Sequence, residues 1–557
     1  MMTGLRRTVM LFASSVLVVG VLVAPAGAVA TTWYVDNTVA CNDSTVDSSV
    51  TPYCNVQAAI DDASSGDTID IGPGTYASSA DEVALVSGKD LDVSGSGIGV
   101  TTLDGQDARQ VVSVVDASVT VSDLTLTQGL TTIDGPNQED FMSGAGIQVT
   151  NSTLVPEVVA ITDVEISDSQ AQGSGGGAGF YGPMTVTMLR VSVARNISTQ
   201  GCCDGGITEG GGGGIAVGED VTLTLEDSSV TDCETTSAGA WSTGGAIAVM
   251  QHTSTLFVID STLSGNEVGS LGGAIFNNGG TVTVTGSTLS LNTASQQGGA
   301  FYAVRDSAVL TMTDSVVTGN SADDGGGLYL WGNTTSSYTI SGSEISLNTA
   351  TSTGGGVVLD GHGSAFLTTI TDSDVSDNTA SSHGGGIYIE GLADLTLTRS
   401  LVEGNTSTFG GGGGLYVHPD STGTKVVESS TFSGNTAAGL GGGISGMSGV
   451  LSNSTVTGNY GDAGGGIGGT GVPLVSNSII AGNSSLVLAP DCEGILSARY
   501  NLIGDTSDCT ITGLTTGYLY NQYPLFGPLA VNGGPTETHA LLAGSPAKYA
   551  GNPATPD

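Results

Sequence analysis

The chain has 557 residues, of which 89 are glycine and only 11% are charged, against about 7% glycine and roughly a quarter charged residues in an ordinary globular protein. Its 11 basic and 53 acidic residues give a formal net charge of −42, which excludes nucleic acid and anionic membranes as partners because both require clustered Lys and Arg. A hydrophobic content of 38% and a mean hydropathy of +0.17 exclude a disordered chain.

The first 30 residues have the pattern of an export signal. Arg6 and Arg7 precede an apolar stretch over 9–23, and Ala-Val-Ala closes the segment at 28–30. This order is typical of a secretory signal peptide cleaved after Ala30. Because no later segment has about 18 consecutive apolar residues, no transmembrane helix is predicted.

Export would place the seven cysteines in an oxidising environment. Two pairs that are close in sequence lie near the two ends of the mature chain, and both are predicted to form disulfides: Cys41 with Cys54, and Cys492 with Cys509. The remaining three cysteines, an odd number, are Cys202, Cys203 and Cys233. A disulfide from Cys233 to Cys202 or to Cys203 is expected, and the choice between the two stays open.

Residues 31–142 are predicted to form an N-terminal cap followed by irregular coils. The segment from Asn55 to Ala63 places its apolar residues on one face of a short helix, directly before a strand at Thr68–Ile71. The segments 89–105 and 111–127 are predicted to form the first, irregular coils. A helix at this point would cover an otherwise open sheet edge.

A ladder of asparagines recurs at intervals of 24 to 30 residues: Asn266, Asn292, Asn320, Asn348, Asn378, Asn405, Asn435, Asn459 and Asn483. Each asparagine has Ser five residues before it and an apolar residue three before it. The repeat extends toward the N-terminus, where the position of the ladder asparagine is taken by Cys233, Asn196 and Ser169.

A second ladder consists of small residues, mostly glycine, followed by a short strand. The first apolar residues of these strands are Ile147, Phe180, Ile215, Ile247, Ile275, Phe301, Leu328, Val357, Ile387, Leu415, Ile444 and Ile467. Between the two ladders lie stretches such as Thr281–Val284 whose alternation of polar and apolar residues predicts strands.

Short strands that recur every 23 to 37 residues, with no room for crossover helices, can stay parallel only if the chain winds as a solenoid. The two ladders therefore predict an all-β, single-stranded parallel β-helix, regular over 143–483 and closed by a short N-terminal capping helix. Like positions would stack about 4.8 Å apart along the axis. From 484 both ladders stop, and 484–557 is predicted to form a C-terminal cap or tail.

Three parts of the chain resemble known families. Over 143–483, two motifs alternate: two glycines followed by a small and then a large apolar residue, and S-x-x-x-x-N. They resemble the GGAI and FxxN repeats of polymorphic outer-membrane proteins. Only Phe432 supplies the Phe of the FxxN repeat. The segment NVQAAIDDASSGDTIDIGPGTY is similar to the capping segment of secreted pectate-lyase-like proteins. The tail from YNLIGDTSDC to HALLAGSPA resembles a choice-of-anchor Q region. These resemblances imply a right-handed β-helix and export; adhesins and enzymes both occur among such proteins.

Function is expected on the outer face of the strands that follow the glycine runs. Their second positions form an aromatic row, predicted to point outward and bind the apolar faces of sugar rings: Phe276, Tyr302, Tyr329, Val358, Tyr388 and Tyr416. Their fourth positions form a second row, in which Trp331 is a further candidate for binding: Asn278, Val304, Trp331, Asp360, Glu390 and His418. The competing interpretation is that the aromatics only pack on one another.

Asp360 and Glu390 would lie one coil apart, with their carboxylates roughly 5 to 6 Å from each other, the separation found in retaining glycosidases. Proximity of like charges would raise the pKa of one carboxyl and make it a proton donor. His418 is a candidate base or substrate ligand. The pair is also a candidate calcium site, and the competing reading is a solvated acidic face.

The sequence thus predicts a secreted, cell-surface or outer-membrane-associated monomer that acts in adhesion or glycan binding through its lateral face, with a polysaccharide or a host or cell-surface glycan as partner. No cofactor besides calcium is expected. The first alternative is a polysaccharide lyase or glycoside hydrolase of the pectin-lyase-like fold, with Asp360, Glu390 and His418 as catalytic candidates, and the second is a structural surface rod.

Overall fold

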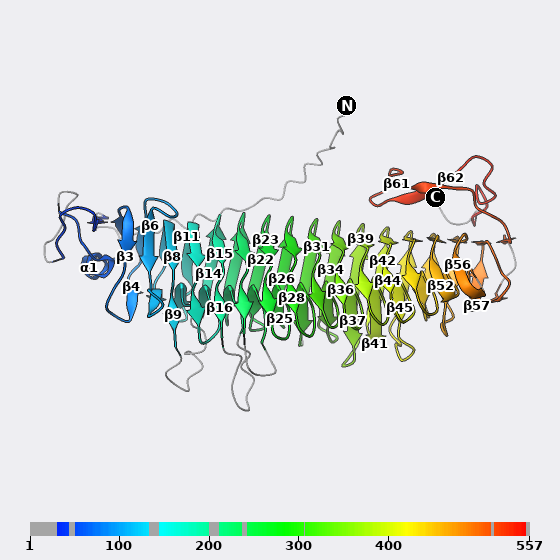
Figure 1. The fold of residues 1–557 in the computed structure, drawn as a ribbon, viewed down its shortest axis with the longest axis horizontal. Coiled ribbons are helices and arrows are strands. Elements are labelled where there is room, and N and C mark those ends of the chain that lie inside the picture. Colours follow the sequence, from blue (N-terminus) through cyan, green and yellow to red (C-terminus); the bar gives the residue numbers. More distant parts are fainter. Residues whose placement is uncertain are drawn as a thin grey trace.

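The computed structural model describes residues 30–43, 51–132, 144–199, 211–236, 242–305, 307–488, 490–513 and 517–552. In this part of the chain the strands up to β60 form one long solenoid, with the single helix α1 (Val56–Asp62) at one end (Figure 1). No helix among these residues is long and apolar enough to span a bilayer.

Each coil of the regular part, from β13 to β56, contains four short strands. In one coil these are β25 (Ile275–Asn278), β26 (Thr281–Thr285), β27 (Thr288–Ser290) and β28 (Thr293–Ala294). Each pairs in parallel with the equivalent strand of the next coil. β25 belongs to a 14-stranded sheet, β26 and β27 to a 33-stranded sheet that bends between them, and β28 to a 13-stranded sheet.

The 14-stranded sheet carries the candidate site. From β10 on, its strands follow the glycine runs. The strands are β4 (Glu82–Ser87), β7 (Gln110–Val115), β10 (Ile147–Thr150), β13 (Ala178–Tyr181), β17 (Ile215–Val217), β21 (Ile247–Val249), β25, β29 (Phe301–Val304), β33 (Leu328–Trp331), β37 (Val357–Gly361), β41 (Ile387–Gly391), β45 (Leu415–Val417), β49 (Ile444–Ser445) and β53 (Ile467–Gly468). The predicted solenoid is confirmed, including the short capping helix.

Alternation along the strands builds the core. In β26, Val282 and Val284 are fully buried while the three threonines that alternate with them are half-exposed. The turn into the 14-stranded sheet requires glycine because the backbone is left-handed there and crowded. Gly384 has φ of 68°, and a Cβ at this position would lie 2.7 Å from the carbonyl oxygen of Ile387.

The asparagines form a buried hydrogen-bonded ladder. The Asn378 amide donates to the Ile345 carbonyl at 2.8 Å and to Oδ1 of Asn405 at 3.0 Å. Its own Oδ1 accepts from the backbone N–H of Asn348 at 3.0 Å and from the Asn348 amide at 2.9 Å. From Asn266 to Asn483, each coil is therefore joined to the next by side-chain hydrogen bonds as well as by strand pairing, as is typical of stacked in-register strands.

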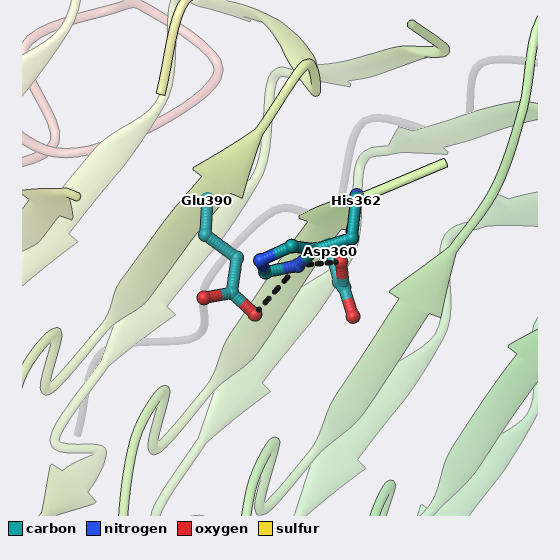
Figure 2. A group of neighbouring side chains, drawn as sticks. All are labelled: Asp360, His362 and Glu390. Atoms are coloured by element: carbon teal, nitrogen blue, oxygen red, sulfur yellow. Dashed lines mark hydrogen bonds and ion pairs between the residues drawn. The ribbon is translucent and has the colours of Figure 1, made fainter. Parts of the chain in front are cut away.

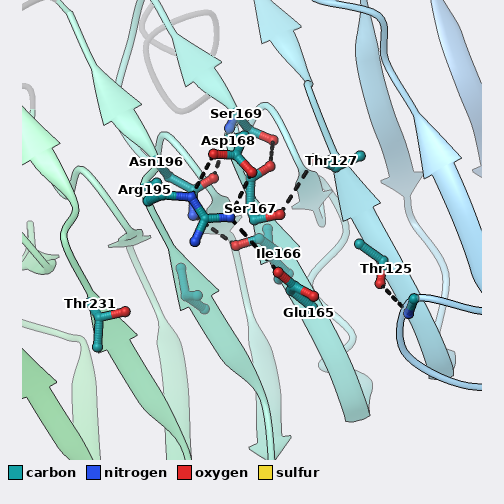
Figure 3. A network of polar contacts seen from close by, with 12 residues as sticks. Thr125, Thr127, Glu165, Ile166, Ser167, Asp168, Ser169, Arg195, Asn196 and Thr231 are labelled. Atoms are coloured by element: carbon teal, nitrogen blue, oxygen red, sulfur yellow. Dashed lines mark hydrogen bonds and ion pairs between the residues drawn. The ribbon is translucent and has the colours of Figure 1, made fainter.

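The substituted positions keep the same geometry at the N-terminal end of the ladder (Figure 3). Asn196 Oδ1 accepts from the backbone N–H of Ser169 at 3.0 Å, and its amide donates to the Ile166 carbonyl at 2.8 Å. Beside it, Arg195 makes a two-pronged ion pair with Asp168, with both N–O distances 2.7 Å. An exposed ion pair thus lies beside a buried amide ladder.

Cys233 is free and buried. Its backbone N–H donates to Asn266 Oδ1 at 3.0 Å, so it holds the ladder position. The expected bond from Cys233 to Cys202 or Cys203 is therefore absent from the structure, and these two residues lie outside the described ones. Burial raises the pKa of the Cys233 thiol to about 12, which keeps it protonated and unreactive.

Helix α1 covers the N-terminal end of the core. Asn55 caps it by accepting from the backbone N–H of Gln57 at 2.8 Å, and Val56, Ala59 and Ile60 are buried. The predicted disulfide between Cys41 and Cys54 is present directly before the helix. This end of the sheet is thereby closed to pairing with another chain.

Beyond residue 484 the 33-stranded sheet continues through β57 (Gly494–Arg499), β58 (Leu502–Ile503), β59 (Cys509–Thr512) and β60 (Leu519–Tyr520). The predicted disulfide between Cys492 and Cys509 is present here. The antiparallel hairpin of β61 (Phe526–Ala530) and β62 (Thr538–Leu541) then lies back along the outside of the solenoid (Figure 1). His539 contacts the Ser433 hydroxyl at 3.0 Å, which ties this hairpin to an earlier coil.

Candidate functional site

The predicted aromatic row exists on the 14-stranded sheet. Phe276, Tyr302 and Tyr329 are direct register partners in successive coils. After Val358 the row continues with Tyr388 and Tyr416. Strand register alone brings these side chains into one line, because equivalent positions of successive coils stack.

The rings of the row cover one another instead of forming an open platform. Ring centroids are 5.8 Å apart for Phe276 and Tyr302, 5.3 Å for Tyr302 and Tyr329, and 5.6 Å for Tyr388 and Tyr416. The predicted exposure is wrong for the four residues that are at most 7% accessible: Phe276, Tyr302, Tyr329 and Tyr388. Rings stacked at one coil's rise bury each other's faces, and packing against Met250 and Leu271 completes their burial.

Asp360 and Glu390 are brought together as predicted, since they are register partners in β37 and β41. Each carboxylate is held by a tyrosine of the aromatic row. The Tyr329 hydroxyl donates to Asp360 Oδ2 at 2.7 Å, and the Tyr388 hydroxyl donates to Glu390 Oε2 at 3.1 Å. Asp360 is 7% exposed, so its carboxylate is fixed in a largely buried position beneath the surface.

His362 completes the cluster, and sequence reasoning missed it. Its Nδ1 lies 2.7 Å from Asp360 Oδ1 and 3.5 Å from Glu390 Oε1, and its backbone N–H donates to Asp360 Oδ1 at 2.9 Å (Figure 2). The side chain is 65% exposed. The signal for His362 was its place two residues after Asp360, which continues the outward alternation by one step beyond the four positions that were considered.

The charges of the cluster perturb its members. The hydrogen bond to Asp360, together with the nearby carboxylates, raises the pKa of His362. Burial, and then the negative charge of Asp360, raise the pKa of Glu390. Burial and the adjacent carboxylates also raise the pKa values of Tyr329 and Tyr388, which therefore remain hydrogen-bond donors. The site can accept hydrogen bonds, and it can supply a proton from Glu390 or His362.

The other candidates surround this cluster without contacting its carboxylates. His418 lies beside Tyr388, with ring centroids 6.5 Å apart, and its Nδ1 is 3.8 Å from Asp420 Oδ2. Trp331 is the register partner of Asp360 on the other side and is half-buried. Tyr416 is also half-buried, and its ring packs 4.3 Å from that of His383. Trp331 and Tyr416 are thus the partly exposed aromatics that flank the cluster.

Asp360, His362 and Glu390 are the residues of the site that could hold a metal ion. One donor atom from each lies within 4.8 Å of the other two, and no other such group of three occurs among the described residues. The predicted calcium pair is therefore joined by a nitrogen donor.

Two family models match the chain. The one described as a right handed beta helix region matches residues 111–345, and the one described as periplasmic copper-binding protein (NosD) matches residues 241–460. No curated protein matches this chain.

Several solved structures are similar at low identity. The A-module of Azotobacter vinelandii mannuronan C-5 epimerase AlgE6 is 15% identical over 84% of this chain and 94% of its own, with a TM-score of 0.33. The GH136 lacto-N-biosidase from Eubacterium ramulus is 12% identical over 71% and 67%, with a TM-score of 0.29. Pectate lyase Pel9A is 12% identical over 88% and 82%, with a TM-score of 0.20. With the parallel sheets and the first family model, the chain is a right-handed parallel β-helix, as predicted.

Proposed function

We propose that this protein is an exported β-helix protein that binds a polysaccharide or a cell-surface glycan at the face formed by β33, β37 and β41. The observation that carries the proposal is the network in which Tyr329 and Tyr388 hold the carboxylates of Asp360 and Glu390 beneath an exposed His362. Fixed polar groups beside partly exposed aromatics are what orient a carbohydrate in a binding site.

The charge of the chain favours a neutral glycan over an acidic one. The formal net charge is −42, and the cluster contains two carboxylates, which repel the carboxylates of a uronic acid polymer. Sugar hydroxyls can donate to Asp360 and Glu390, and the apolar face of a sugar ring can lie on the exposed part of Trp331 or Tyr416. Adhesion through a long lateral surface is consistent with this mode of binding.

Replacing Trp331 by Ala is expected to weaken retention on the bound glycan by roughly 5- to 10-fold, about 1 kcal/mol, because one partly exposed stacking surface is lost. Retention on a panel of neutral and acidic polysaccharides measures this loss. Phe257 is the matched control, since it is a half-buried aromatic on the 33-stranded sheet. Equal retention of Trp331→Ala and Phe257→Ala would show that glycan binding lies elsewhere, and retention on none of the panel would contradict the proposal.

Glycoside hydrolysis is the second candidate, favoured by the geometry of the carboxyl pair. Oxygens of Asp360 and Glu390 lie within 4.8 Å of each other, close to the roughly 5 to 5.5 Å of retaining glycosidases. The raised pKa of Glu390 suits a general acid, which leaves Asp360 as the nucleophile. Substrate would have to displace the His362 ring, which is exposed enough to rotate away.

Glu390→Gln is expected to abolish the release of reducing ends, at least about 100-fold, because the amide cannot donate the proton to the leaving oxygen. Glu403→Gln is the control, since Glu403 is a half-exposed carboxylate on the 33-stranded sheet. If the wild-type protein releases product and Glu390→Gln releases it equally well, Glu390 has no catalytic role. Retention without any product from the whole panel would leave glycan binding as the only activity of this face.

A further inference from the structure

Three donor atoms of different chemistry converge on one point of the 14-stranded sheet. Asp360 and His362 project from the same strand and its end, two residues apart and therefore to the same side. Glu390 reaches the same point from the next coil. His362 Nδ1 is 2.7 Å from an Asp360 oxygen and 3.5 Å from a Glu390 oxygen. Tetrahedral ligands that each lie about 2.0 to 2.2 Å from one ion are roughly 3.3 to 3.6 Å from one another. The Glu390 oxygen already has this spacing from the His362 nitrogen, and the shorter Asp360 contact would lengthen slightly on binding.

The supporting residues separate this cluster from a chance pair of acids. One oxygen of each carboxylate is held by a buried tyrosine hydroxyl, Tyr329 at 2.7 Å and Tyr388 at 3.1 Å. The other oxygen of each is turned toward His362. Outer hydrogen bonds that orient the ligating carboxylates are a regular feature of metal sites. A solvated acidic face has no need of buried donors aimed at its carboxylates.

The donor set identifies the class of ion. Calcium takes six to eight oxygen ligands, whereas a cluster of one imidazole nitrogen and two carboxylates suits zinc and related transition metals. Three protein ligands leave one position of a tetrahedral ion free, and it would face solvent, because the His362 side chain is 65% exposed. We infer that Asp360, His362 and Glu390 bind one divalent transition-metal ion, with an open position toward solvent, in place of the calcium expected from the carboxylates alone.

Zinc titration of the mature protein after treatment with a chelator tests this inference. Calorimetry is expected to find one strong Zn²⁺ site per chain, unaffected by millimolar Ca²⁺. His362→Ala is expected to weaken Zn²⁺ binding by at least about 10-fold, and Tyr329→Phe, which keeps all three ligands, by roughly 10-fold. His418→Ala is the control, since His418 lies on the same face without contacting the carboxylates. Co²⁺ should give visible absorption bands that His362→Ala loses.

The inference is overturned if the wild-type protein binds no Zn²⁺, if His362→Ala and His418→Ala bind it equally, or if Ca²⁺ displaces it. Thermal unfolding of each variant excludes loss of fold as the cause of a lost site. The metal site does not depend on the proposed glycan binding. Glycan retention measured in the presence of chelator tells the two apart, since a protein that retains glycan but binds no metal refutes only this inference.

Discussion

Replacing Asn378 by Ala is expected to lower the free energy of unfolding by about 3 to 5 kcal/mol. The side chain is fully buried and donates to the Ile345 carbonyl and to Asn405 Oδ1, while its oxygen accepts two bonds from Asn348. Its removal leaves buried backbone groups of Ile345 and Asn348 without these partners, at about 1 to 3 kcal/mol each. Because each coil contacts only its neighbours, the loss weakens the contacts on both sides of one coil.

Urea unfolding followed by far-UV circular dichroism measures this effect. Thr379→Ala is the matched control, since Thr379 is the next residue, lies in a strand of the same coil and is half-exposed. We expect its unfolding free energy to change by no more than about 0.5 kcal/mol. Equal stability of the two variants would mean that the amide ladder contributes little beyond the strand pairing.

The contribution of Lys425 to the stability of the protein is expected to rise between about pH 8 and pH 10.5. This lysine begins β46 (Lys425–Glu428) and is 1% exposed, with its ammonium donating to the Ser421 hydroxyl at 2.6 Å and the Gly423 carbonyl at 2.7 Å. Burial lowers its pKa to about 8 from its usual 10.5. In this pH window the unfolded chain therefore binds more protons than the folded one, and raising the pH favours folding.

The expected rise in the Lys425 contribution to the unfolding free energy is about 3 kcal/mol, from roughly 1.4 kcal/mol for each unit of pKa. Denaturant unfolding at a series of pH values from 7 to 10.5 measures it, and the difference between wild type and Lys425→Met isolates this one group from the other titrating residues. Lys548→Met provides the comparison with a lysine outside the solenoid core. A difference between wild type and Lys425→Met that does not change with pH would contradict the prediction.

The fold could be predicted because its determinants are local and repeated. The asparagine and glycine ladders place the same chemistry at the same point of every coil, and parallel stacking turns a repeat in sequence into a row in space. The same reasoning brings Asp360 beside Glu390, because register partners follow from the repeat. The capping helix and both terminal disulfides were likewise readable from short-range pattern and spacing.

The burial of the candidate site residues depends on contacts between coils. Sequence alternation says that a side chain points out of a strand, but burial depends on what the neighbouring coils place above it. Tyr329 and Tyr388 point outward and are still buried, because stacked rings and adjacent loops cover them. Cys233 holds a ladder position as a free thiol, a result that depends on its packing and not on the number of cysteines.

The sequence by itself therefore determined the solenoid, its register and the meeting of Asp360 with Glu390, since these depend on periodic local pattern. Only the tertiary structure brought His362 between the two carboxylates and placed a tyrosine hydroxyl behind each of them. Those contacts depend on side-chain conformations at the end of one strand and on the packing of three successive coils. A sequence repeat specifies which positions are neighbours. It does not specify side-chain conformations or the packing between coils.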